Sequence, residues 1–259
     1  MHTEKIRIYP NKSQRELINR ILWNCKELYN YFLQLNIDQY DKDKTFIWKY
    51  DLIKHIPEFK FDEDVIIYSQ VKQNVASRMD DALNRVKIGN HFPKFKSYNQ
   101  YRSFTYPQAS GFKLQPEKNR IRLGKFGSVK AVFTREFYGK VKTCSIMKMR
   151  SDKYYAFVTF DDKDIPQPIP VRMKGSIGID LGVSKFITTH EGDYIASSRF
   201  LRKNLKKLAE AQRKLSRSQK DSNNHQKARH RVARIYEKIT NCKIDFLYKV
   251  SYYLVYTYD

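Results

Sequence analysis

The segment from Gly175 to Ile195, GSIGIDLGVSKFITTHEGDYI, places one carboxylate, Asp180, in its apolar first half. Apolar and small side chains alternate around Asp180, and a second β-prone run from Lys185 to Thr189 precedes the turn signal Glu-Gly-Asp. This pattern predicts a β-hairpin with Asp180 in the middle of its first strand. A carboxylate at such a position needs a metal ion, a hydrogen-bond donor or water beside it, because burying it without a partner costs free energy.

Three interpretations of this hairpin are open. Asp180 can lie at a solvated strand edge, its strand can be the first strand of a ribonuclease H-like nuclease, or the hairpin can bind phosphate as in actin-like sugar kinases and ATPases. The kinase fold needs small hydroxyl residues directly after the second glycine and a long second half with further phosphate loops. Val183, Ser184 and Lys185 follow that glycine in a chain of 259 residues, which disfavours the kinase.

The charge of the chain predicts a polyanionic partner. It carries 50 Lys and Arg residues against 27 Asp and Glu residues, a formal net charge of +23. A nucleic acid fits better than a membrane surface, because the sequence has no run of about 18 apolar residues. The three cysteines form no C-x-x-C pair and the first residues form no signal sequence, so we expect a cytoplasmic protein without disulfides.

The first third of the chain predicts a short strand followed by helices. After a strand at residues 4–9, Asn11 is a candidate N-cap with Gln14 three residues later. Apolar residues recur at helical spacing from Ile18 to Leu35, and further helices are expected at 49–56 and about 65–85. The last of these helices is expected to bury Val71, Val75, Met79, Ala82 and Val86.

The sequence pattern changes at Phe92, after which short β-prone runs are separated by turns rich in Gly, Asn and Lys. Antiparallel strands forming a small β-barrel are expected near residues 111–114, 120–123, 128–132, 141–149 and 154–160. Three prolines, Pro166, Pro168 and Pro170, then predict a linker before the Asp180 hairpin.

The residues after about 200 predict two long helices joined by the polar turn Asp221 to Asn224. Basic residues crowd their outer surface and acidic residues are scarce, which favours contact with nucleic-acid phosphates over an ordinary solvated face. The backbone-contact residues expected on this basis are Arg202, Lys203, Lys206, Lys207, Arg213, Lys214, Arg217 and Arg231.

Four stretches, in order along the chain, together resemble one family. They are YPNKSQRELI, SFTYPQASGFKL, GSIGIDLGVSKFITT, and the basic run that begins FLRKNLKKLAEAQRKLSRSQK and continues to KARHRVARIYEKI. They closely resemble TnpB, the transposon-encoded RNA-guided nucleases ancestral to type V CRISPR effectors, along nearly all of the chain.

The resemblance implies an α+β multidomain fold. Residues 1–9 and 92–172 would form a wedge β-barrel, residues 10–91 an inserted helical recognition domain, and residues 173–259 a partial RuvC-like (ribonuclease H-like) domain with a basic helical hairpin. Members of the family bind a guide RNA, recognise a short target-adjacent motif, unwind the DNA duplex and cleave it at a metal-dependent site.

In the family, the acid of the I-D-L-G strand is one of three carboxylates. The second is a Glu on the strand after the helical hairpin, and the third is an Asp beyond a four-cysteine zinc module. The chain stops at Asp259, before those positions, so Asp180 is expected to be a vestigial catalytic acid with no bound metal. Mg²⁺ is expected only for a nuclease, because two-metal hydrolysis needs several converging anionic ligands.

The resemblance therefore predicts RNA-guided binding of double-stranded DNA without cleavage, with repression by promoter occlusion. The alternatives are an RNA-guided DNA endonuclease of which this is the N-terminal part, and a decayed product without activity. The expected partners are a guide RNA and a duplex with a short adjacent motif, bound by a monomeric ribonucleoprotein at the bacterial nucleoid, with no membrane partner and no cofactor for binding. By resemblance, the motif is contacted by Tyr50, Ser69, Gln70, Lys72, Gln73, Asn74, Thr105 and Tyr106.

Overall fold

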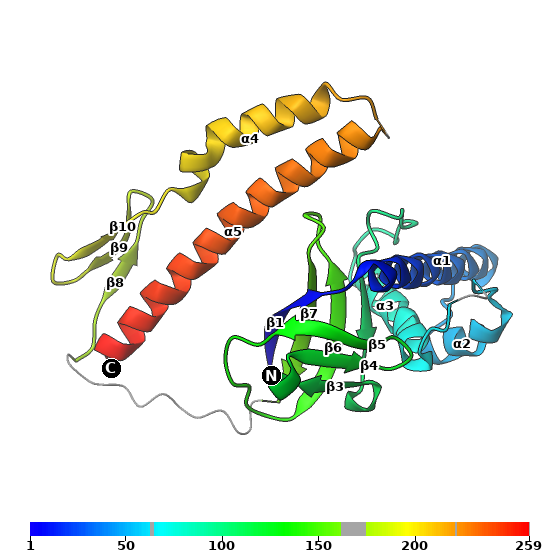
Figure 1. The fold of residues 1–259 in the computed structure, drawn as a ribbon. Helices are drawn as coiled ribbons and strands as arrows, with labels where there is room; N and C mark the ends of the chain where they lie inside the picture. Colours follow the sequence, from blue (N-terminus) through cyan, green and yellow to red (C-terminus); the bar gives the residue numbers. More distant parts are fainter. Residues whose placement is uncertain (63–64, 162–174, 221, 259) are drawn as a thin grey trace. The chain divides into compact units, whose positions relative to one another are not determined.

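The computed structural model describes residues 1–62, 65–161, 175–220 and 222–258, which separate into two units (Figure 1). The first unit holds the described residues up to 161, apart from Arg150–Asp152. The second unit holds those three residues and the described residues from 175 onward. The predicted proline linker and the predicted boundary at residues 172–173 lie outside the described residues.

The first unit is built on a seven-stranded antiparallel sheet in the order β2-β6-β7-β1-β5-β4-β3. Strand β1 lies inside the sheet, where it pairs with β7 on one side and β5 on the other. The strands are β1 (His2–Tyr9), β2 (Ser103–Tyr106), β3 (Phe112–Gln115), β4 (Arg120–Leu123), β5 (Gly127–Val132), β6 (Val141–Lys148) and β7 (Tyr154–Phe160). The strands predicted between residues 111 and 160 all form, with bounds that differ by one residue or less.

The sheet curls until its two edge strands come close. The Tyr106 hydroxyl at the end of β2 donates a hydrogen bond to the carbonyl of Gly124, which follows β4, at 3.0 Å. The ring of Tyr106 also lies 6.5 Å from the ring of Phe112 at the start of β3. The sheet is therefore nearly closed, consistent with the predicted barrel.

Three α-helices accompany this sheet: α1 (Lys12–Asp43), α2 (Lys49–Lys54) and α3 (Ser69–Lys87). The predicted capping box is confirmed, because Asn11 Oδ1 accepts from the Gln14 amide at 2.8 Å and Gln14 Oε1 accepts from the Asn11 amide at 3.1 Å. Helix α3 begins at Ser69, four residues later than predicted. Short 3-10 helices occur at Ile56–Glu58, Ala109–Gly111 and Pro116–Lys118.

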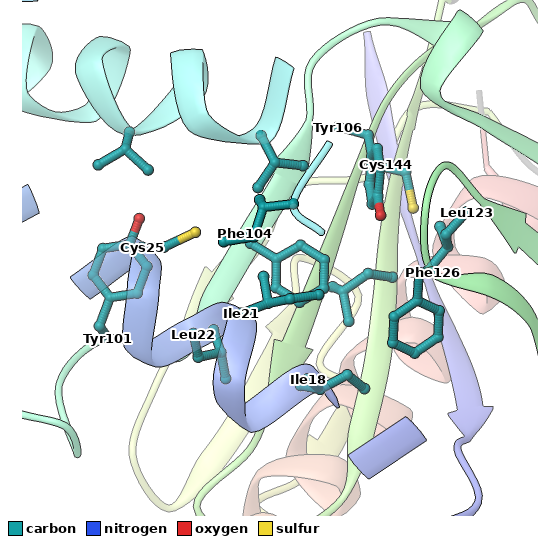
Figure 2. Close-up of a cluster of buried hydrophobic side chains, with 14 of the residues drawn as sticks. Ile18, Ile21, Leu22, Cys25, Tyr101, Phe104, Tyr106, Leu123, Phe126 and Cys144 are labelled. Atoms are coloured by element: carbon teal, nitrogen blue, oxygen red, sulfur yellow. The ribbon is translucent and has the colours of Figure 1, made fainter. Parts of the chain in front are cut away.

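The helices and the sheet share one hydrophobic core. Figure 2 shows Ile18 and Leu22 of α1 beside side chains of the sheet region, including Phe104 of β2. Helix α3 adds Leu83, which is fully buried and was not part of its predicted apolar stripe. Ala82 and Val86, which the stripe did include, are only partly buried. The predicted helical insertion thus packs directly onto the sheet.

The second unit contains a three-stranded antiparallel sheet, in the order β10-β9-β8, and two long helices. Its elements are β8 (Ile179–Leu181), β9 (Lys185–Thr189), β10 (Tyr194–Ala196), α4 (Phe200–Ser216) and α5 (Asn223–Thr257). Helix α5 begins at Asn223 because the Ser222 hydroxyl caps it by accepting from the His225 amide at 3.1 Å. Asn223 and Asn224 therefore belong to the helix and not to the predicted turn.

The second unit has a thin core. Its hairpin and helices meet at Phe246, whose ring lies 5.2 Å from the ring of Phe186 and 5.9 Å from that of Phe200. Among its described apolar residues, Ile187, Leu208, Ala211, Ala228, Ile239, Val250 and Tyr258 are buried. None of the described helices combines the length and apolar composition that a membrane span requires.

Candidate nucleic-acid interface

The face formed by α3 and β2 brings together several residues predicted to contact the motif. Ser69 and Gln73 are exposed on α3, whereas Gln70 and Asn74 of the same helix are partly buried. Thr105 of β2 is also partly buried, and its hydroxyl lies 2.7 Å from that of Ser145 on β6. The exposed amide of Gln73 beside the half-buried amides of Gln70 and Asn74 makes a polar surface with fixed and free hydrogen-bonding groups.

Arg78, which was not among the residues predicted from the sequence, connects α3 to β2 on this face. Its Nε donates to Asn74 Oδ1 at 3.2 Å, and one terminal nitrogen donates to Thr105 Oγ1 at 2.9 Å. The other terminal nitrogen donates to the Ser103 carbonyl at 2.7 Å. The guanidinium group also lies over the Tyr101 ring, 5.3 Å from its centroid. A single side chain therefore holds α3 against the edge strand β2.

Two further residues of the predicted set are held by neighbours. Gln70 Nε2 donates to Gln108 Oε1 at 2.6 Å, which ties the start of α3 to the segment after β2. The ammonium group of Lys72 lies 4.1 Å from the ring centroid of Phe61. These contacts orient both side chains before any nucleic acid arrives.

The remaining two residues of the set lie in opposite environments. Tyr50 on α2 is 77% exposed, and α2 is fixed to α3 because the Lys49 amide donates to Asp80 Oδ1 at 3.1 Å. Tyr106 is only 1% exposed, and burial raises the pKa of its hydroxyl. The ring of Tyr106 is part of the core, so this side chain is not available to a DNA ligand in this structure.

The second basic surface is a groove of about 970 Å³ where α4 ends and α5 begins. Four of the predicted backbone-contact residues, Arg213, Lys214, Arg217 and Arg231, line this groove, together with Lys227. Glu210 is the acidic residue among its described lining side chains. Closely spaced cations without matching carboxylates attract phosphate groups. We call this feature the hairpin groove.

The other four predicted backbone-contact residues lie along the first half of α4. All four are exposed: Arg202, Lys203, Lys206 and Lys207. They are not among the residues that line the hairpin groove. The structure therefore divides the predicted basic face into a groove at one end of the helical pair and an open surface along α4.

Asp180 lies in the middle of β8, as predicted, and it is exposed opposite Thr188 of β9. The following turn needs a glycine at position 182, because a Cβ there would lie 2.6 Å from the Lys185 carbonyl oxygen. In the described part of the chain, no three His, Cys, Asp or Glu residues come together as a metal site would require. Asp180 and its described neighbours thus do not fit a two-metal centre.

Comparisons with known proteins match both ends of the chain. A family model described as a probable transposase, OrfB of the IS605 group, matches residues 160–259. A second model of the same group, described as a helix-turn-helix domain, matches residues 3–45. In this structure those residues form β1 and the uninterrupted helix α1, so they do not have the two-helix geometry that this description names.

Two curated proteins are similar to the chain. "Putative RNA-guided DNA endonuclease InsQ" of Escherichia coli strain K12 is 36% identical over 160 residues, which cover 62% of this chain and 39% of that protein. "Putative RNA-guided DNA endonuclease" of Streptomyces pristinaespiralis is 25% identical over 260 residues, which cover 97% of this chain and 63% of that protein. The chain thus spans less than two thirds of the length of either relative.

The two family models match different ends of the chain, and both belong to one group of transposon proteins. The chain is therefore similar to the IS605 OrfB group of probable transposases over residues 3–45 and 160–259, which agrees with the resemblance to TnpB that its sequence motifs indicate.

Proposed function

We propose that this polypeptide binds a guide RNA and, with it, a matching DNA duplex beside a short motif, without cutting the DNA by itself. The observation that carries the proposal is the hairpin groove, which five cationic side chains and one carboxylate line. Such a groove attracts a phosphate backbone irrespective of base sequence. The names of both relatives, which include RNA-guided action on DNA, support the same class of function.

The proposal assigns different tasks to the two basic or polar surfaces. The hairpin groove and the exposed cations of α4 hold nucleic-acid backbone, which fixes position without reading sequence. The α3 and β2 face, with exposed Gln73 and half-buried Asn74, contacts the base edges of the motif. Base pairing with the guide supplies the remaining specificity.

The surroundings of Asp180 support the proposal of binding without cleavage. Phosphodiester hydrolysis by two metal ions needs several carboxylates that hold both ions and stabilise the attacking and leaving oxygens. Among the described residues, Asp180 lies on an exposed strand and belongs to no cluster of three or more possible metal ligands. A bound complex that overlaps a promoter would then repress transcription by occupying the site. We propose that it acts as a monomeric ribonucleoprotein at the bacterial nucleoid.

A second candidate function is RNA-guided DNA cleavage, which the names of both relatives favour. In that case the further carboxylates would come from residues beyond those described, and Mg²⁺ would be required. The two candidates share guide binding and target binding, and they differ only in the fate of the bound DNA.

The test uses the 259-residue chain purified from its host together with any RNA that co-purifies. The complex is assayed for binding to a matched duplex library and, in parallel, for nicking of a matched plasmid in Mg²⁺ or Mn²⁺. We expect guide-dependent binding, no nicking, and no effect of Asp180→Ala on binding. Guide-dependent cutting that Asp180→Ala abolishes would establish the endonuclease. Equal binding with and without guide RNA would refute the RNA-guided function.

A further inference from the structure

Arg78 determines which atoms of Asn74 are free to meet a ligand. An arginine side chain carries only hydrogen-bond donors, so the Asn74 atom that faces Arg78 Nε at 3.2 Å must be the amide oxygen. The amide nitrogen Nδ2 then points away from Arg78. Among the described residues, no hydrogen bond is made by Asn74 Nδ2.

The Arg78 side chain has little freedom to release Asn74. Its two terminal nitrogens donate to the Ser103 carbonyl at 2.7 Å, to the Ser103 hydroxyl at 3.3 Å and to the Thr105 hydroxyl at 2.9 Å. The Tyr101 ring lies against its guanidinium group. A planar group held by hydrogen bonds on all three nitrogens and by one ring keeps a fixed orientation. The hydrogen bond from Arg78 therefore holds the amide of Asn74 in one orientation as well.

We propose that Arg78 is a positioning residue that makes Asn74 present its Nδ2 as a hydrogen-bond donor to a base edge of the target-adjacent motif. This inference rests on the proposed function, which places the α3 and β2 face against DNA. An unrestrained asparagine can turn over its amide and so offer either a donor or an acceptor. Asn74 in this structure offers a donor.

The proposal has a consequence for base preference. In the major groove, adenine and guanine offer the N7 acceptor and thymine offers the O4 acceptor, whereas cytosine offers the N4 donor. The Nδ2 donor of Asn74 can therefore hydrogen-bond to adenine, guanine or thymine, and it disfavours cytosine at the base that it faces. The expected discrimination is about fivefold in affinity, the effect of one hydrogen bond.

The experiment measures guide-dependent binding of the full chain to duplexes with every base at every motif position. We expect one position at which the wild-type chain disfavours cytosine. Asn74→Asp should reverse this preference, because one carboxylate oxygen pairs with Arg78 and the other presents an acceptor, which favours cytosine or adenine. Arg78→Lys keeps the charge but loses the planar fork, so the discrimination against cytosine should fall at that position alone.

Two matched variants serve as controls. Asn84→Asp makes the same change on α3 beside Asp80, away from Arg78, and Arg85→Lys makes the same change as Arg78→Lys on an exposed residue. Neither control should alter the base preference. Far-ultraviolet circular dichroism and tryptophan fluorescence check that each variant is folded.

Each outcome bears on one of the two proposals. An unchanged base preference in Asn74→Asp, or unchanged discrimination in Arg78→Lys, would overturn the inference and leave the proposed function standing. Guide-dependent binding that is equal for all bases at every position would overturn the inference and the motif-reading part of the proposed function, and it would leave guide-dependent DNA binding standing. Absence of guide-dependent binding to any duplex would refute the proposed function and this inference together.

Discussion

At the scale of single residues, burial alters the acidity of several groups in the first unit. Burial raises the pKa of the Cys25 thiol from its ordinary value of 9.0 to about 12, although the nearby charges of Arg78 and Lys72 lower it somewhat. Burial also raises the pKa of the Cys144 thiol and of the Tyr101 hydroxyl. These groups stay neutral in the folded chain at pH values where they ionise in the unfolded chain.

The first prediction is a loss of stability in alkaline solution. Above about pH 9 the unfolded chain releases protons that the folded chain keeps, so the free energy of unfolding of the first unit should fall as pH rises. For Cys25, the loss starts near pH 9 and is complete near pH 12, with a slope of up to about 1.4 kcal/mol per pH unit. Urea unfolding at a series of alkaline pH values, followed by tryptophan fluorescence, measures the slope.

Cys25→Ala should make this pH dependence shallower, whatever it costs in packing at neutral pH. Cys242→Ala is the matched control, because Cys242 lies on α5 in the second unit and should leave the slope unchanged. A slope that is identical in wild type and Cys25→Ala would contradict the assignment of this effect to the buried thiol.

Single residues also show how far sequence predicts structure. The capping role of Asn11 was predictable because its partner Gln14 lies three residues away, within one turn. The role of Arg78 was not predictable, because its acceptors Ser103 and Thr105 lie on a strand that the sequence does not place beside α3. The burial of Tyr106 was equally hidden, since it depends on the closure of the sheet near Gly124.

At the scale of elements, the pairing of α4 with α5 creates the hairpin groove. Sequence predicted two basic helices and their cations, because helical periodicity and charge are local properties. It could not predict which cations share a groove. Arg213 and Arg231 come together only because α5 starts at Asn223, where Ser222 caps it, and this start sets the alignment of the two helices.

The second prediction concerns the hairpin groove. Arg213→Ala with Arg217→Ala should weaken RNA binding and reduce the dependence of log K on log salt by about 0.7 to 0.9 for each phosphate that is no longer neutralised. The control is Lys238→Ala with Lys243→Ala, which removes the same charge from exposed positions of α5 outside the groove. Filter binding of the co-purifying RNA at several salt concentrations measures both slopes.

A larger loss of salt dependence in the groove variant than in the control variant would show that the hairpin groove binds phosphate locally. If both reduce the slope equally, the helical pair attracts nucleic acid through its general charge and the groove has no special part. If neither changes the slope, the basic face is an ordinary solvated surface.

At the scale of the whole molecule, the two units differ in how well they are packed. The main core cluster runs from Ile6 to Phe160, entirely within the first unit. The second unit buries few large side chains and leaves apolar ones such as Leu247, Tyr248 and Tyr252 half exposed or more on α5. Less buried apolar area means less stabilisation.

The third prediction is therefore unfolding in two steps on heating. Both tryptophans, Trp23 and Trp48, lie in the first unit, whereas α4 and α5 supply about half of the described α-helical residues. Circular dichroism at 222 nm should lose part of its signal at a lower temperature than the tryptophan fluorescence changes. Added guide RNA should raise the midpoint of the first step, because it binds the folded second unit. Coincident transitions by both probes would contradict this division.

The position of β1 inside the sheet has a consequence for how the chain is made. Of the seven strands, β1 leaves the ribosome first, yet its partner β7 ends at Phe160, which pairs with His2. At about 5–20 residues per second, roughly 10–30 s of translation separate the two strands. Until β5 emerges, the nascent chain carries β1 without a neighbouring strand, and until β7 emerges it carries a helix, α1, whose apolar stripe has no complete sheet to cover it. Ribosome-bound chaperones would therefore meet this chain early, and a nascent chain stalled before β7 could not complete its sheet.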